Sequence, residues 1–249
     1  MNIELLPISY EGRIGVIGLD GLAAHCKPYL TTGDVLVVTQ KAVSFAEDRV
    51  VNLTAVESTT RAQVLSQTIN ADPRFVQLIL QESQVMRVGK NSLLTRMPNG
   101  MVCNNAGIDA FGVGQDLVCL LPVDSDASAK ALSKLLDVPV VISDTQSRFY
   151  RAGVVNVAIG SWGLAPVVNY IGQIDGFGNQ LKSTIIAVAD ELATAADLVM
   201  EKFAGVPMVV VRGYPYVKAE TNAQIINNTQ RYSLLDLLQQ EGEDSGTDK

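Results

Sequence analysis

The sequence has very little of the residue that builds most catalytic and zinc centres. A single histidine, His25, occurs among its 249 residues. Zinc sites and Ser-His-Asp triads depend on histidine, so either kind of site would have to use this one side chain. Because His25 lies in an otherwise apolar segment, we expect a surface or satisfied core imidazole, and both kinds of site are effectively excluded.

Cysteine is also scarce, with three residues and no C-x-x-C spacing. Cys103 and Cys119 lie inside apolar runs, which is typical of small buried side chains rather than of disulfides or zinc ligands. This usage fits a reducing compartment best. The sequence therefore predicts a cytoplasmic protein.

Neither a lysine- and arginine-rich run nor a long uncharged apolar stretch occurs. The formal net charge is −7, which argues against the basic track that nucleic-acid phosphates require. The N-terminus lacks a basic segment followed by an apolar one, and no uncharged apolar stretch reaches about 18 residues. We expect neither a nucleic-acid partner nor a membrane association, and a chain of this length can bury a core without disulfides or metals.

Short β-branched runs and amphipathic segments both occur in the chain, which predicts strands and helices. The first thirty residues favour a strand and a loop over a helix. Further strands are expected at 35–38, 90–96, 101–103, 117–122, 140–144 and 208–213, and an apolar run lies at 154–159. Helices are expected at 58–69, 72–85, 127–136, 183–203 and 223–240. In the 183–203 helix we expect Asp190 and Glu191 to be solvated, although one of them could face a site.

Two aspartates follow apolar runs at separate chain turns. Asp109 comes after a small polar turn, and Asp144 ends a strand and precedes Thr145. Carboxylate and hydroxyl oxygens suit Mg²⁺, which takes one or two carboxylates and leaves positions for water and phosphates. Arg148 and Arg151 follow closely and could neutralise phosphate charge, as could Lys41. These residues indicate metal-assisted phosphoryl transfer, but a structural Asp144–Arg148 pair remains an alternative.

Two common nucleotide-binding motifs are absent. Neither G-x-G-x-x-G nor G-x-x-x-x-G-K-[ST] occurs around the glycines at 112 and 114. Rossmann and P-loop folds are therefore excluded.

Several segments, spread over roughly residues 1 to 215, together resemble the coenzyme F420-0:γ-glutamyl ligase family. N-A-G-I-D at 105–109 resembles the family's N-A-G-[IV]-D, and V-I-S-D-T at 141–145 is followed by Arg148, Arg151 and Gly153 as in the family. Further matches lie at 33–47, 120–129, 157–160 and 205–213. The joint order and spacing of these segments make the resemblance specific.

The resemblance implies a GTP- and divalent-metal-dependent ligase of the mixed α/β type, using Mg²⁺ or Mn²⁺. GTP would phosphorylate a carboxylate of an acceptor such as F420-0, and the amine of L-glutamate would displace phosphate. The family fold implies two intertwined lobes and a homodimer. For this chain we expect one ligase-type domain at 1–240, with 88–180 as a possible inserted lobe, and a disordered acidic tail at 241–249.

By similarity, each candidate residue takes a role at the site. Asp109, Asp144, Arg148 and Arg151 would be catalytic, and the metals would be held by Asp109, Asp144, Thr145 and Glu201. The nucleotide would be bound by Leu6, Pro7, Ile8, Ser9, Thr39, Gln40, Lys41 and Ser44, and by the loop at 201–208.

The sequence departs from the family pattern mainly at expected nucleotide contacts. Phe45 stands where the family has a lysine, and Gly112 where it has an asparagine. Gln146 and Ser147 replace a common F-G or N-G pair, and the usual M-G-[EQ] is lost at 200–202. Three interpretations stay open: a true F420-type ligase, a relative with the same chemistry on another acceptor, or a non-catalytic binding or regulatory homologue.

Overall fold

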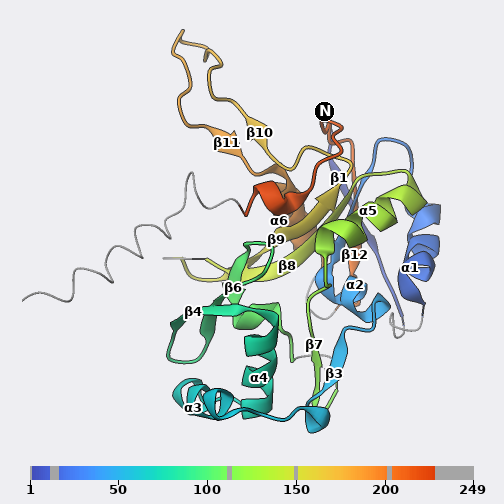
Figure 1. Cartoon of the computed structure of the whole chain (residues 1–249). Helices are drawn as coiled ribbons and strands as arrows, with labels where there is room; N and C mark the ends of the chain where they lie inside the picture. Colours follow the sequence, from blue (N-terminus) through green and yellow to red (C-terminus); the bar gives the residue numbers. More distant parts are fainter. Residues whose placement is uncertain (1, 12–16, 111–113, 149–150, 201–203, 228–249) are drawn as a thin grey trace, which may run out of the picture.

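A five-stranded sheet forms the centre of the computed structural model, which describes residues 2–11, 17–110, 114–148, 151–200 and 204–227. The strand order is β1-β12-β2-β8-β9, and β2 and β8 run parallel while the other neighbours are antiparallel. The strands are β1 (Glu4–Ile8), β2 (Val35–Thr39), β8 (Val140–Ser147), β9 (Val154–Trp162) and β12 (Met208–Arg212) (Figure 1). The parallel pair brings two strand ends to the same edge of the sheet.

Helices cover both faces of this sheet. Helices α1 (Gly18–Cys26), α2 (Gln40–Ala46) and α5 (Ser125–Leu136) pack on one face, and α6 (Val188–Met200) packs on the other. Strand β2 shows why: Leu36 and Val38 enter the first core, while Val35 and Val37 enter the second. Alternate side chains of a strand point to opposite faces, so a continuous β-branched run is buried on both sides.

A second group of elements has its own apolar core beneath the sheet (Figure 1). It contains helices α3 (Thr60–Ile69) and α4 (Pro73–Glu82), the antiparallel pair β3 (Val50–Asn52) and β7 (Leu117–Cys119), and a three-stranded sheet of β4 (Gln84–Val88), β5 (Leu93–Arg96) and β6 (Val102–Asn104). The expected lobe at 88–180 stays a prediction; β8 and β9, from within those bounds, belong to the five-stranded sheet.

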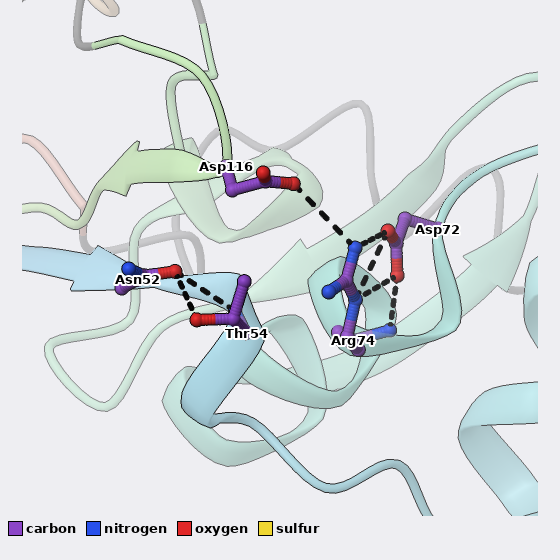
Figure 2. Close-up of polar contacts among 5 residues, drawn as sticks. All are labelled: Asn52, Thr54, Asp72, Arg74 and Asp116. Carbon is purple, nitrogen blue, oxygen red and sulfur yellow. Dashed lines mark hydrogen bonds and ion pairs between the residues drawn. The ribbon is translucent and has the colours of Figure 1, made fainter.

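An ion cluster of partly exposed side chains links α4 to the loop before β7. The Arg74 guanidinium lies between Asp72, whose Oδ2 is 2.6 Å from Nη2, and Asp116, whose Oδ1 is 3.8 Å away (Figure 2). Asp72 also caps α4 by accepting a hydrogen bond from the Arg74 backbone N–H at 2.7 Å. These side chains are committed to one another, so we assign the cluster a structural role.

A long hairpin extends from the body of the molecule (Figure 1). Its base is formed by β10 (Val168–Asn169) and β11 (Ile185–Ile186). Two large apolar side chains near its tip, Ile174 and Phe177, are 64% and 93% exposed. Scattered exposed apolar residues are normal on a monomer, but a projecting arm that carries two of them is a candidate contact surface.

The structure confirms the predicted helices at 58–69 and 127–136 as α3 and α5, and the predicted central strands as β2, β8 and β12. Strand β8 continues to Ser147, past the expected end at Asp144, because it pairs with β9 along that length. The strand expected in the first thirty residues is confirmed as β1, but the preference against a helix there was wrong, because α1 forms a helix that buries Leu22, Ala23 and Cys26. Helix α6 begins later than predicted because residues 185 and 186 pair with β10. Only a short 3₁₀ turn, Ala223–Ile225, lies in the predicted 223–240 helix, whose remainder, like the tail, falls outside the described residues after 227.

Asp190 was expected to be solvated, and the structure corrects this. Its Oδ1 accepts a hydrogen bond from the Ala158 backbone N–H at 2.9 Å, where β9 bulges against β8. Burial raises the pKa of Asp190. In the described part of the chain, no helix has both the length and the apolar character needed to cross a membrane.

Candidate active site

The candidate site lies at the edge of the central sheet where β2 ends beside β8. Thr39, the last residue of β2, pairs with Ser143 in the parallel register, so Gln40 and Lys41 follow β2 at the level where β8 continues through Asp144 and Thr145 to Ser147. Strand β12 starts at the same edge, and Thr39 N–H donates a hydrogen bond to the Pro207 carbonyl at 2.9 Å. Ligands in open α/β sheets bind at such carboxyl ends, because the loops there diverge and leave a crevice.

A cavity of about 300 Å³ opens at this edge. Most of its lining residues are polar, and they include three carboxylates and one lysine. The lining residues are Tyr10, Thr39, Gln40, Lys41, Asp109, Ser143, Asp144, Thr145, Asn156, Asp197, Met200, Gly205, Val206 and Pro207. The two aspartates singled out from the sequence thus face one cavity, together with Thr145 and Lys41.

Asp109 reaches this cavity from the second group of elements through an unusual backbone path. Asn105 and Ala106 adopt left-handed conformations with φ of 51° and 56°. The turn is held because Asn105 Oδ1 accepts from Leu93 N–H at 2.9 Å and Thr95 Oγ1 accepts from Ala106 N–H at 2.9 Å. Asp109 then exchanges two backbone hydrogen bonds with Cys119. Strained conformations of this kind persist only where the surroundings enforce them, and they concentrate at functional sites.

Gly107 completes the turn and cannot be replaced without movement. Its φ is 66°, and a Cβ atom there would lie 2.6 Å from Leu121 Cδ1. The glycine of the N-A-G-I-D segment is therefore required by both backbone conformation and close packing.

Lys41 and Asp109 form the principal ion pair of the site. Lys41 Nζ lies 2.6 Å from Asp109 Oδ2, and the two side chains are 30% and 31% exposed. The pair joins helix α2 to the second group of elements across the cavity. A partly exposed pair of this kind can separate when a competing cation or anion arrives.

The oxygen donors at the cavity fit a hard divalent cation. Asp109, Asp144 and Thr145 line one space, and the Thr145 hydroxyl donates a hydrogen bond to Asn156 Oδ1 at 2.8 Å. Among the described residues no group of three or more acidic, histidine or cysteine side chains could hold a metal. Two carboxylates and a hydroxyl match Mg²⁺ or Mn²⁺, which take the rest of their ligands from water and phosphates.

A second, smaller hollow of about 200 Å³ adjoins the cavity and shares Asp144 and Thr145 with it. Its other lining residues are Leu94, Val102, Cys103, Asn104, Gly107, Gln146, Ser147 and Arg148. Arg148 thus lines this hollow, and its Nη2 donates to the Ala152 carbonyl at 2.8 Å. The alternative of a structural Asp144–Arg148 pair stays open, because Arg148 and Asp144 line the same hollow.

The remaining predicted residues lie at varying distances from the cavity. Leu6, Pro7 and Ile8 belong to β1, and Ser9 leads from it to Tyr10, which lines the cavity. Ser44 is fully buried and donates to Gln40 Oε1 at 3.0 Å, so it supports a residue that lines the cavity. Arg151 is exposed, Phe45 packs against the first core, and Glu201 and Gly112 lie outside the described residues. Their assigned roles stay predictions.

Sequence reasoning missed three cavity residues: Tyr10, Asn156 and Asp197. Asn156 carried a signal, because it interrupts an apolar strand and is only 4% exposed. A buried amide must be hydrogen-bonded, and it accepts from Thr145. Asp197 lies on α6, and an acidic residue on an amphipathic helix is ordinarily interpreted as a solvent-exposed side chain.

The nearby cysteines are not nucleophiles. Burial raises the pKa of Cys103 to about 11, and burial also raises the pKa of Cys119 to about 11. A thiol is reactive as its thiolate, and at neutral pH these two remain protonated. The chemistry of the site is therefore that of oxygen ligands and cations.

Fold and site together define an α+β protein with a cavity suited to a divalent cation and phosphate groups. The sequence profile of the family described as F420-0:Gamma-glutamyl ligase matches residues 17–213, and the chain belongs to this family. It is 40% identical over 195 residues to a coenzyme F420:L-glutamate ligase of Methanothermobacter thermautotrophicus, covering 75% of this chain and 77% of that one.

Two further relatives carry the same name. The Methanopyrus kandleri protein is 38% identical over 221 residues, which cover 86% of this chain and 87% of the relative. The Archaeoglobus fulgidus protein is 40% identical over 222 residues, covering 86% and 88%. The family match covers every residue that lines the cavity except Tyr10.

Proposed function

We propose that this protein is a GTP- and divalent-metal-dependent ligase that joins L-glutamate to a carboxylate of coenzyme F420-0. The proposal rests on family membership and on one structural observation: Asp109, Asp144, Thr145 and Lys41 line a single cavity at the edge of the sheet where β2 ends beside β8. That arrangement gives both the anionic ligands for a cation and a positive charge for a phosphate.

The proposed reaction has two steps. A carboxylate oxygen of the acceptor attacks the γ-phosphorus of GTP, the bond to the bridging oxygen breaks, and GDP leaves with that electron pair. The amine nitrogen of glutamate then attacks the acyl carbon of the resulting acyl phosphate. The carbon–oxygen bond to phosphate breaks, the nitrogen loses a proton, and amide and inorganic phosphate are released.

Each cavity residue has a defined part in this scheme. A bound Mg²⁺ or Mn²⁺ would neutralise charge on the transferring phosphoryl group. Asp109 and Asp144 would hold that ion, and the Thr145 hydroxyl, oriented by Asn156, would offer a further oxygen. Lys41, which pairs with Asp109, would supply positive charge for the phosphate oxygens if Asp109 held the ion. Tyr10 and the segment at 205–207 border the space for the nucleotide.

We further propose that the protein is a homodimer. The hairpin based on β10 and β11 carries the exposed Ile174 and Phe177 away from the body of the chain. Large apolar side chains on a projecting arm gain free energy when a second copy covers them. The arm is therefore the part of the surface that we expect to lie at the interface.

Calorimetric titration with GTP, GDP and ATP, each with and without Mg²⁺ or Mn²⁺, tests nucleotide use. We expect binding of GTP and GDP that requires the metal and that disappears in Asp144→Asn. ATP binding as tight as GTP binding would contradict the assigned nucleotide. No metal-dependent nucleotide binding, with unchanged behaviour in the variant, would leave a non-catalytic homologue as the better account.

A further inference from the structure

The small hollow beside the cavity has the size and lining of a site for an amino acid. Its volume is about 200 Å³, below the roughly 300–1,000 Å³ of pockets for drug-sized ligands. Leu94 and Val102 give it an apolar wall, and Asn104, Ser147 and Arg148 give it a polar one. A short aliphatic chain with charged ends matches this division.

Arg148 supplies the charge that such a ligand needs. One end of its guanidinium is engaged, since Nη2 donates to the Ala152 carbonyl at 2.8 Å. Its Nε is buried, yet it has no hydrogen-bond partner among the residues that the structure describes. A buried N–H of a charged group without an acceptor is costly, so the site gains when a carboxylate enters and accepts this hydrogen.

The position of the hollow relative to the cavity fits the second step of the reaction. The two spaces meet at Asp144 and Thr145, which line both. A nucleophile bound in the hollow faces the point where phosphate would leave. Asn104 Nδ2 donates a hydrogen bond to Ser147 Oγ at 3.3 Å, which links two of the residues that line the hollow.

We propose that this hollow is the L-glutamate subsite and that Arg148 binds one of the two glutamate carboxylates through Nε. The inference rests on the proposed ligase function and makes it more specific. Arg148 then acts on the amino acid substrate rather than on the transferring phosphate. The glutamate amine is thereby directed towards the Asp144 edge shared with the nucleotide cavity.

Steady-state kinetics with the full chain, GTP, F420-0 and Mn²⁺ test the subsite. For Arg148→Met we expect the KM for glutamate to rise about 10- to 100-fold, as for loss of a charge-assisted hydrogen bond. The KM values for GTP and F420-0 should stay within about 2-fold of wild type. Arg148→Lys should restore part of the loss, and Arg61→Met, an exposed arginine on α3, is the matched control.

Substrate analogues identify the carboxylate. Wild type should discriminate against L-glutamine or L-isoglutamine, which carry an amide in place of the side-chain or the α-carboxylate. Discrimination against one of them should vanish in Arg148→Met. If that variant does not fold, Val102→Phe narrows the opposite wall of the hollow and should also raise the glutamate KM alone.

Two outcomes separate the inference from the function on which it rests. A wild-type enzyme that forms no product contradicts the ligase function itself. A wild-type enzyme that is active, with Arg148→Met lowering kcat at an unchanged glutamate KM, overturns the subsite and returns Arg148 to phosphoryl transfer. An equal rise in all three KM values also overturns it.

Discussion

Lys41 Nζ lies 2.6 Å from Asp109 Oδ2, and this ion pair links the region of the central sheet to the second group of elements. Lys41 follows a strand of the central sheet, whereas Asp109 belongs to the group of elements that holds the third core. The Lys41 amine contacts the Asp109 carboxylate, which we propose as a metal ligand. Under the proposed function, binding of the cation and release of the lysine towards phosphate would be coupled.

Replacing Lys41 tests this coupling. Lys41→Met removes the competing amine, so we expect Mn²⁺ to bind more tightly in calorimetry without nucleotide. Loss of a cation that stabilises developing charge should lower kcat by about 100- to 1,000-fold. Lys134→Met, an exposed lysine on α5, serves as the control and should change neither quantity. Unchanged kcat in Lys41→Met would remove the lysine from the mechanism.

Asp34 and Arg212 predict acid sensitivity of the fold. Asp34 is 1% exposed and accepts from Arg212 Nε at 3.0 Å and Nη2 at 2.8 Å. Burial alone would raise the pKa of Asp34, but hydrogen bonds from Arg212 and Thr31 outweigh it and lower the pKa. A lowered folded-state pKa gives stabilisation that is present above the unfolded value of about 3.9 and is lost as the pH falls through the folded-state pKa.

Denaturant unfolding of Asp34→Asn measures this contribution. At pH 7 we expect the free energy of unfolding to fall by about 2–4 kcal/mol, because Arg212 and the Thr31 turn lose a buried charged acceptor. The difference from wild type should shrink as the pH falls below about 4. Asp20→Asn, exposed on α1, should cost less than about 1 kcal/mol. A difference that persists in acid would contradict the assignment.

Asp190 predicts the opposite pH dependence. Burial raises its pKa, so its ionisation costs stability as the pH rises through the folded-state value. Asp190→Asn keeps an acceptor for Ala158 N–H without the charge, and we expect it to be more stable than wild type at neutral pH. Asp190→Ala leaves that N–H unpaired and should lose about 1–3 kcal/mol. Thermal unfolding of both variants would refute the account if the two shifts had the same sign.

Substitutions on the projecting hairpin test the proposed homodimer interface. Ile174→Asp combined with Phe177→Asp places charge on the proposed contact, so light scattering after size exclusion should give the mass of one chain where wild type gives two. Val123→Asp, at a residue that is 80% exposed elsewhere, should leave the dimer intact. A wild-type monomer, or an intact dimer in the double variant, would contradict the proposed interface.

The central sheet could be predicted from sequence because its strands carry their own signals. Val35 to Val38 is a β-branched run that can be buried on both faces, and the structure buries all four residues. Helix α1 could not be predicted in this way, because the glycines at 18 and 21 disfavour a helix and its formation depends on the packing of Leu22 and Cys26. Tertiary contacts decide such segments more than propensity does.

The site was predictable in part for a similar reason. Asp109 and Asp144 stand out because each follows an apolar run at a turn, and the structure places both at one cavity. Asp197 and Tyr10 carry no local signal, because their positions depend on how α6 and β1 pack against the sheet. The assignment of Arg148 to the smaller hollow likewise follows from geometry, since sequence spacing groups it with Asp144 alone.

Tracing heavy oxygen from the acceptor carboxylate tests the proposed ligase reaction directly. Wild type and Asp109→Asn are incubated with GTP, Mg²⁺, L-glutamate and F420-0 carrying heavy oxygen in its carboxylate, and products are analysed by mass spectrometry. We expect wild type to add a glutamyl unit and to release phosphate that carries one heavy oxygen. We expect Asp109→Asn to do neither. A wild-type enzyme that forms no glutamyl product, or that forms it with unlabelled phosphate, would contradict the account.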